Sequence, residues 1–469
     1  MGKYRYLFKN IGLLTLSSFA TKLISFFLVP LYTNVLTTGE YGTYDLFATT
    51  TSVLLPVLTL NIQEAVIRFT LDKSYDKEAI ATVAVKYLIG SSFVVASGLF
   101  INYVFGFSQV IKDYSVYFFL IYFSQVIVGI MVSYIRGIDR IADLSISSVI
   151  CAVVTIGCNI LFLVVLKWGL VGYFLTNIIG PLVQCSYLIY RSRFFAVIHL
   201  RKKYTAVNKE MTAYSKPLIA NSLGWWVNNA LDRYVIIFFC GISANGIYSV
   251  ASKIPGILNI FQTIFNSAWA LSAVKEFDPE DKDGFFSNTY KAYNCFMTLA
   301  CSGIIVADKL LAKLLYAKDF YIAWQYVPWL TIAILFGALS GYLGGFFTAV
   351  RDSKVFAQST IIGAACNVVL NIAMTPFMGP LGAAIATTVC HIIVWAIRLK
   401  QSQKYIKLHF RLKRDIITYI ILVVQSGMLL FFHGMLLYGI EITLFCMTIC
   451  LYLNDIQHIF HRITGKTNI

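Results

Sequence analysis

Apolar stretches long enough to cross a bilayer recur along the whole 469-residue chain, and they restrict its fold more than any other feature. A membrane-spanning helix needs about 20 consecutive, mainly apolar residues. Hydrophobic residues make up 58% of the chain and charged residues only 13%, which is more apolar surface than a soluble protein could bury. We therefore predict an all-α polytopic membrane protein. The predicted spans are 11–36, 44–66, 81–105, 114–135, 144–166, 168–190, 217–241, 246–272, 285–307, 320–347, 356–377, 381–399, 416–432 and 434–452.

The number of spans has two interpretations. Because the last two stretches are short and closely spaced, the chain has either fourteen membrane helices or twelve helices plus a re-entrant pair.

The basic residues predict the orientation. With a cytoplasmic N-terminus, cytoplasmic segments hold 28 Lys and Arg residues and external loops hold 5. This asymmetry is the positive-inside pattern. It predicts a multi-pass protein with both termini in the cytoplasm, and it attributes the net charge of +16 to topology rather than to nucleic-acid binding. The first apolar run is predicted to be an uncleaved helix and not a signal peptide.

The two halves of the chain resemble one another. Tyr41-Gly-Thr-Tyr44 and Asn245-Gly-Ile-Tyr248 are offset by 204 residues, and Gly169-Leu-Val-Gly172 and Gly379-Pro-Leu-Gly382 by 210. We predict two six-helix lobes in parallel orientation around a central cavity, as in transporters with parallel repeats; a duplication without transport is the alternative. The predicted parts are an N-terminal lobe over 1–200 with a basic cytoplasmic connector to 216, a C-terminal lobe over 217–400, and a basic loop, two extra helices and a cytoplasmic tail over 401–469.

Sequence motifs for catalysis and for cofactors are absent. The chain has no Walker A loop, HExxH or GxSxG motif, and no loop is long enough to fold as a catalytic domain. The ten cysteines lie almost entirely in apolar runs, where small packing residues are a simpler interpretation than disulfides or a metal site. We expect no enzyme activity, no cofactor and no metal site.

Four charged residues lie inside predicted spans and away from their ends: Lys22, Asp232, Arg233 and Lys253. The other charges within spans lie near their ends, except Glu441, which lies deep in a helix whose assignment is open. A charge at the bilayer centre costs roughly 2.5–3.5 kcal/mol on insertion scales, so it is kept where it faces a cavity or a partner. Three of the four are cations, which predicts an anionic ligand. Snorkelling to the interface is the alternative for a lysine.

The seventh predicted span carries a polar stripe. Trp225, Asn228 and Asp232 fall on one helical face, with Asn229 and Arg233 beside it. A polar stripe in lipid must point inward, so these residues are candidates for substrate binding. A buried Asp–Arg pair that merely joins helices is the alternative.

Three stretches resemble the bacterial polysaccharide flippases, the O-antigen and capsule exporters of the multidrug/oligosaccharidyl-lipid/polysaccharide (MOP) superfamily. They are residues 63–69 (QEAVIRF), the segment from Trp225-Trp226 to Asp232-Arg233-Tyr234, and residues 246–255 (GIYSVASKIP). The resemblance extends from about residue 8 to residue 400 and implies a MATE-like arrangement of lobes.

The resemblance also implies a function. The substrate would be an undecaprenyl-diphosphate-linked oligosaccharide, moved out of the cytoplasmic leaflet of the bacterial plasma membrane for O-antigen, capsule, exopolysaccharide or lipopolysaccharide synthesis. Lys22, Arg233 and Lys253 would meet the diphosphate, whereas Trp225, Asn228 and Asn229 would contact the sugars. Asp232 is the candidate proton-linked site, H+ or Na+ the coupling ion, and polysaccharide polymerase and glycosyltransferases the partners beside the lipid bilayer.

Three alternatives remain open at this point. The multidrug extrusion branch would need acidic residues in the first lobe, where Lys22 stands instead. The lipid II flippase branch would bind a similar diphosphate. A membrane glycosyltransferase or polymerase would need a large external loop, and the chain has none.

Overall fold

The computed structural model describes residues 26–350 and 352–463, apart from a few side chains that include those of Trp225, Asn228 and Asn229. All regular secondary structure in these ranges is helical, which confirms the predicted all-α class. The chain forms two compact units, Met1–Ala230 and Leu231–Ile469. The helix that crosses this boundary, α10 (Thr205–Cys240), has Pro217 inside it and begins well before the predicted start at residue 217.

The first unit is built around one central helix. Its elements are α2 (Val29–Val35), α3 (Thr38–Leu58), α4 (Ile62–Leu71), α5 (Lys77–Phe105), α6 (Gln109–Asp113), α7 (Ser115–Gly137), α8 (Ile141–Asn159), a π-helical turn (Ile160–Val165), α9 (Gly169–Ser192), a short 3-10 helix (Phe194–Val197) and the first part of α10. Helix α7 packs against α3, α4, α5 and α9. Buried residues of α7 such as Tyr122 and Met131 therefore lie at the centre of the apolar core.

The second unit is built in the same way around α14. Its elements are α11 (Ile242–Ala251), α12 (Pro255–Lys275), α13 (Phe285–Leu315), a 3-10 helix (Lys318–Gln325), α14 (Val327–Ala349), α15 (Ser353–Met378), α16 (Pro380–Ser402), α17 (Leu412–Phe431) and α18 (Gly434–Ile463). Helix α14 packs against α12, α13 and α16 and is buried on nearly all sides. As expected for such a position, it is apolar all round.

Most of these helices are long and apolar. Ten helices of the described chain meet the length and composition of a membrane span, or eleven if α3 and α4, which meet at 57°, form one broken span. Both α17 and α18 are among the ten. Helix α13 continues to Leu315, so Lys309 and Lys313 lie within this helix and not in the external loop that the hydropathy pattern predicted.

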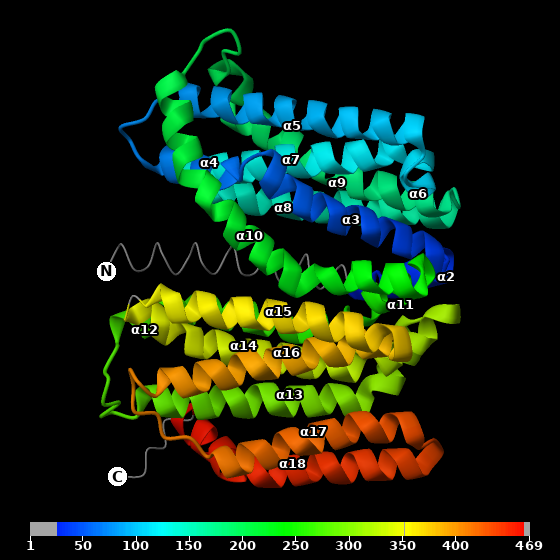
Figure 1. Ribbon diagram of the computed structural model, residues 1–469, viewed down its shortest axis with the longest axis vertical. Helices are drawn as coiled ribbons and strands as arrows, with labels where there is room; N and C mark the ends of the chain where they lie inside the picture. The colour runs from blue at the N-terminus through cyan, green and yellow to red at the C-terminus, as the bar shows by residue number, and fades with distance from the viewer. Residues whose placement is uncertain (1–25, 351, 464–469) are drawn as a thin grey trace. The chain divides into compact units, whose positions relative to one another are not determined.

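The two units repeat one packing pattern. In the first unit α4 and α5 pack on α7, α7 packs on α9, and α8 packs on α9. In the second unit α12 and α13 pack on α14, α14 packs on α16, and α15 packs on α16. Each unit also contains two consecutive helices separated by a break of three residues, α3–α4 in the first and α11–α12 in the second (Figure 1). The internal repeat seen in the sequence therefore corresponds to a repeated helical unit.

The repeated glycines explain part of this pattern. Gly169 is the first residue of α9 and Gly379 directly precedes α16; their φ values are positive, 54° and 60°, a conformation that glycine adopts without strain. A Cβ on Gly172 would lie 2.9 Å from Cβ of Phe162, and one on Gly382 would lie 2.6 Å from the backbone oxygen of Met374. In a membrane, helices associate through such close approach because lipid removes most of the hydrophobic driving force.

Candidate functional site

The residues predicted to bind substrate divide into two groups. Lys22 lies outside the described residues, and the side chains of Trp225, Asn228 and Asn229 on α10 are likewise outside the description. Asp232 and Arg233 lie on α10, and Lys253 lies in the turn between α11 and α12. The structure therefore locates three of the seven side chains, all of them charged and all in the second unit.

Asp232 is the centre of a buried polar cluster. Its Oδ2 accepts a 2.6 Å hydrogen bond from the Tyr248 hydroxyl on α11, and its Oδ1 accepts a 2.9 Å bond from the backbone N–H of Arg233. The guanidinium Nη1 of Arg233 lies 3.8 Å from Oδ1. The side chain of Asp232 is 10% exposed and that of Arg233 is 19% exposed. A buried carboxylate is tolerated when donors and a cation compensate its charge, and both are present here.

A chain of polar side chains continues from Tyr248 to α15. Thr387 on α16 lies within hydrogen-bonding reach of Tyr248. The side chain of Asn367 on α15 donates to the hydroxyl oxygen of Thr387 at 3.3 Å. Asn371 donates in turn to the side-chain oxygen of Asn367 at 3.1 Å. Four helices, α10, α11, α15 and α16, therefore contribute to one polar cluster.

Two oxygen atoms on α15 have no protein donor. The side-chain oxygens of Asn371 and Thr375 are buried and have no hydrogen-bond partner within the residues that the structure describes. At Asp232 itself, the charge is compensated by Arg233 and by the hydroxyl of Tyr248.

The first unit has a neutral counterpart of this cluster. Tyr44 occupies the repeat position of Tyr248, and its hydroxyl donates a 2.9 Å hydrogen bond to Oδ1 of Asn177, the repeat position of Thr387. The ring of Tyr44 packs against Tyr173, 4.5 Å away between centroids. The same scaffold thus carries a tyrosine–amide pair in one unit and a tyrosine–carboxylate pair in the other.

Lys253 occupies a different environment. It lies directly after α11 and before Pro255, the first residue of α12, and its backbone N–H bonds to Val250 O at 3.0 Å. Its side chain is half-buried. No ion pair joins it to Asp232 in the described part of the chain. The structure brings Asp232 and Arg233 together, and it leaves Lys253 at the break between two helices.

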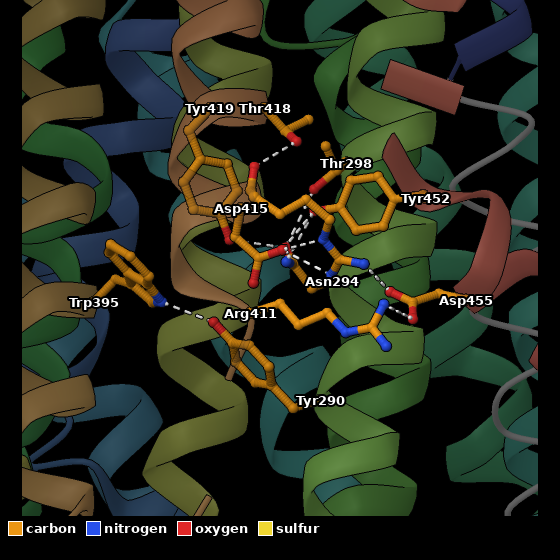
Figure 2. A network of polar contacts seen from close by, with 11 residues as sticks. Tyr290, Asn294, Thr298, Trp395, Arg411, Asp415, Thr418, Tyr419, Tyr452 and Asp455 are labelled. Carbon is orange, nitrogen blue, oxygen red and sulfur yellow. Dashed lines mark hydrogen bonds and ion pairs between the residues drawn. The ribbon is translucent and has the colours of Figure 1, made fainter. Parts of the chain in front are cut away.

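Sequence reasoning missed a second polar cluster, which joins α13, α17 and α18 (Figure 2). Asp415 on α17 accepts hydrogen bonds from Nε of Arg414 at 3.0 Å and from the Tyr452 hydroxyl at 3.1 Å. Asn294 on α13 donates to Tyr452 at 3.1 Å and accepts from Tyr419 at 2.9 Å.

Two arginines extend this cluster. Arg414 forms an ion pair with Asp455 on α18, and Arg411 Nη1 lies 3.6 Å from the same carboxylate. The adjacent Arg414-Asp415 pair was the only sequence signal, since the partners on α13 and α18 are distant along the chain. Each charged side chain in this cluster has a partner of opposite charge, so we interpret the cluster as a structural contact that holds α13, α17 and α18 together.

The chain matches a family of known proteins. Residues 7–270, more than half of the chain, match the family described as "Polysaccharide biosynthesis protein". A curated relative, a probable low-salt glycan biosynthesis flippase of Haloferax volcanii, is 22% identical over 203 residues. These residues are 42% of this chain and 43% of the relative, so the chain spans less than half the length of that protein.

Solved structures show the fold. The lipid II flippase MurJ in an inward closed conformation matches with a TM-score of 0.71 at 15% identity, over 96% of this chain and 98% of MurJ. An inward-facing multidrug resistance MATE transporter of the MOP superfamily matches with a TM-score of 0.64 at 14% identity, over 82% and 95% of the two chains. These similarities confirm the two-lobe, MATE-like fold. The chain belongs to the polysaccharide biosynthesis protein family.

Proposed function

We propose that the protein moves an undecaprenyl-diphosphate-linked oligosaccharide repeat unit across the bacterial cytoplasmic membrane. The family and the glycan flippase relative support translocation of a lipid-linked glycan. The observation that carries the proposal is Arg233, a largely buried cation within the apolar part of α10. A guanidinium binds the oxygens of a phosphate bidentately and stays charged when it is buried.

The pairing of Arg233 with Asp232 suggests how binding is controlled. While Asp232 is ionised, it attracts the Arg233 guanidinium and competes with a diphosphate. A proton or Na+ on Asp232 would weaken that attraction and leave Arg233 free for the substrate. Coupling to an ion gradient would then operate through Asp232, by alternating access of the two lobes. Lys22 and Lys253 are proposed as further diphosphate ligands, and Trp225, Asn228 and Asn229 as sugar contacts.

The cellular role is proposed from the same features. A multi-pass protein with cytoplasmic termini would collect the substrate from glycosyltransferases on the cytoplasmic side and deliver it to a polysaccharide polymerase on the other. O-antigen, capsule, exopolysaccharide and lipopolysaccharide are the candidate products. The chain would act as a transporter and not as an enzyme.

Lipid II is a second candidate substrate, because the fold matches MurJ over nearly the whole chain. Both substrates contain a diphosphate, so the cations alone do not separate them.

A translocation assay separates the candidates. The purified protein is reconstituted in liposomes with an undecaprenyl-diphosphate oligosaccharide, with lipid II or with a cationic drug. We expect transport of the oligosaccharide lipid that is faster than transport of lipid II, and no drug transport. Equal or greater transport of lipid II would favour the second candidate, and drug transport alone would contradict a lipid-linked anion as substrate.

A further inference from the structure

Two carboxyl groups in the second unit are buried without hydrogen-bond partners. Asp308 on α13 and Glu441 on α18 are both 0% exposed. All four of their carboxyl oxygens lack a partner among the residues that the structure describes. The two side chains are close enough to interact electrostatically. They lie where α13, α17 and α18 pack side by side (Figure 1).

The same three helices provide a contrast. In the cluster of Figure 2, Asp415 has Arg414 and Tyr452 as partners, and Asp455 has Arg411 and Arg414. Each of those carboxylates therefore has a counter-charge. Asp308 and Glu441 belong to the same interface but have neither an arginine nor a hydroxyl donor among the described residues. Their charge must be balanced in another way.

The polar groups near this pair are neutral. Ser302 on α13 donates to Oε1 of Gln425 on α17 at 2.8 Å. Nε2 of Gln425 lies 3.5 Å from the backbone oxygen of Glu441, and the Gln425 side chain also interacts with the Glu441 carboxyl group. These neutral residues supply no charge to the site.

One cation interacts with the pair. The ammonium of Lys309 lies 3.4 Å from the backbone oxygen of Phe432 and 4.3 Å from the ring centroid of Trp324, and it interacts electrostatically with both carboxyl groups. The phenol of Tyr321 also interacts electrostatically with Asp308 and with the phenol of Tyr438. A single ammonium balances a single carboxylate. The second carboxyl, buried beside a like charge, is more stable in its neutral, protonated form.

We propose that Asp308 and Glu441 form a protonation site that holds one exchangeable proton between α13 and α18, with Lys309 as the counter-charge. The ligand is a proton and not a metal ion. The Lys309 ammonium already interacts as a cation with both carboxyl groups, and no group of three or more His, Cys, Asp or Glu ligands occurs in the part of the chain that the structure describes. The site is built on the helices after residue 400 together with α13, and it shares no residue with the Asp232 cluster.

Infrared spectroscopy of the full-length protein tests this site without a transport assay. The carbonyl stretch of a protonated carboxyl is separate from the bands of carboxylates and amides. At neutral pH we expect such a band, equal to one group per chain, in the wild type, and its loss in the double variant Asp308→Asn/Glu441→Gln. Either single variant should also lose it, because Lys309 then balances the one remaining carboxylate.

Two further variants test the role of Lys309 and provide a control. Lys309→Met should roughly double the band, since both carboxyls would then be neutral, and this variant keeps both acids in place. Asp415→Asn is the matched control in the same interface and should leave the band unchanged. Identical spectra of the wild type, the double variant and Lys309→Met in this region would overturn the proposal. Because the measurement reports protonation alone, its failure would leave the flippase proposal standing.

Discussion

The hydroxyl of Tyr248 donates a 2.6 Å hydrogen bond to Oδ2 of Asp232 and thereby joins α11 to α10 in the second unit. At the repeat position in the first unit, Tyr44 bonds to the neutral amide of Asn177. Both units therefore keep a tyrosine hydrogen bond, to an amide oxygen in the first unit and to a carboxylate oxygen in the second.

Removing the two tyrosine hydroxyls should have unequal effects on stability. Tyr248→Phe leaves a buried carboxylate with one donor fewer, so we expect a loss of about 1–3 kcal/mol. Tyr44→Phe breaks a neutral, partly buried bond and should cost about 0.5–1.5 kcal/mol. Thermal unfolding of the two variants in the same detergent compares them. Equal losses would show that the charge of Asp232 does not depend on Tyr248.

The repeated glycines should tolerate no side chain. Gly172→Ala and Gly382→Ala place a methyl group against the backbone or Cβ of the facing helix, so each should destabilise the protein by about 1–3 kcal/mol. Gly98→Ala on α5 is the control, because nothing lies within 4 Å of its Cβ position. Unfolding temperatures provide the measurement. A neutral Gly382→Ala would show that α15 and α16 pack less closely than the structure shows.

The stability of the protein should depend on Arg414 in the Asp415 cluster. Arg414→Met leaves Asp415 and Asp455 buried with fewer counter-charges, and breaking a buried pair in this way costs about 3–5 kcal/mol. Lys407→Met breaks the exposed pair with Glu280 and should change stability little. Denaturant titration of both variants compares the loss of the buried pair with the loss of the exposed pair. Similar midpoints would mean that the cluster contributes nothing to the packing of α17 and α18.

The stability of the protein should depend on pH through Asp352 at the start of α15. Asp352 accepts a 2.5 Å hydrogen bond from the Tyr405 hydroxyl and caps α15 through the backbone N–H of Lys354 at 3.1 Å. The Tyr405 bond, more than the backbone bonds, holds the pKa of Asp352 below its usual value of 3.8. A lowered pKa contributes stability above pH 3.8 that is lost as the pH falls through the folded-state value.

The variant Asp352→Asn tests that effect. It should lower the unfolding temperature at neutral pH, and its difference from the wild type should shrink as the pH falls below 3.8. A difference that stays constant with pH would show that the capping bonds act independently of the charge.

Much of the architecture could be predicted from the sequence because lipid imposes simple rules. Apolar length located the helices, and the glycine pairs at offset 210 indicated a repeat, which the structure shows as equivalent starts of α9 and α16. Helix ends were predicted less well. Hydropathy alone ended the ninth span at 307, whereas α13 continues to Leu315 because Asp308 and Lys309 are accommodated by packing.

The polar clusters were harder to predict. The Asp232–Arg233 pair could be predicted because the two residues are adjacent in the sequence. Tyr248 belongs to the repeated segment Asn245–Tyr248. Glu441 was recognised only as a deep charge in an uncertain helix, because its neighbour Asp308 lies 133 residues earlier and was placed at a helix end. Contacts of that kind arise from the packing of α13 on α18, which no local pattern encodes.

The proposed function depends on cations of the chain that bind the diphosphate of a lipid-linked oligosaccharide. Its most direct test is the rate of oligosaccharide-lipid translocation in proteoliposomes by Lys22→Ala, Arg233→Ala and Lys253→Ala variants that insert normally, with Arg233→Lys as the charge-conserving control. We expect Arg233→Ala to slow transport by at least about tenfold, equivalent to ~1.4 kcal/mol, and Arg233→Lys to retain more activity. Wild-type rates in all three alanine variants would contradict the claim.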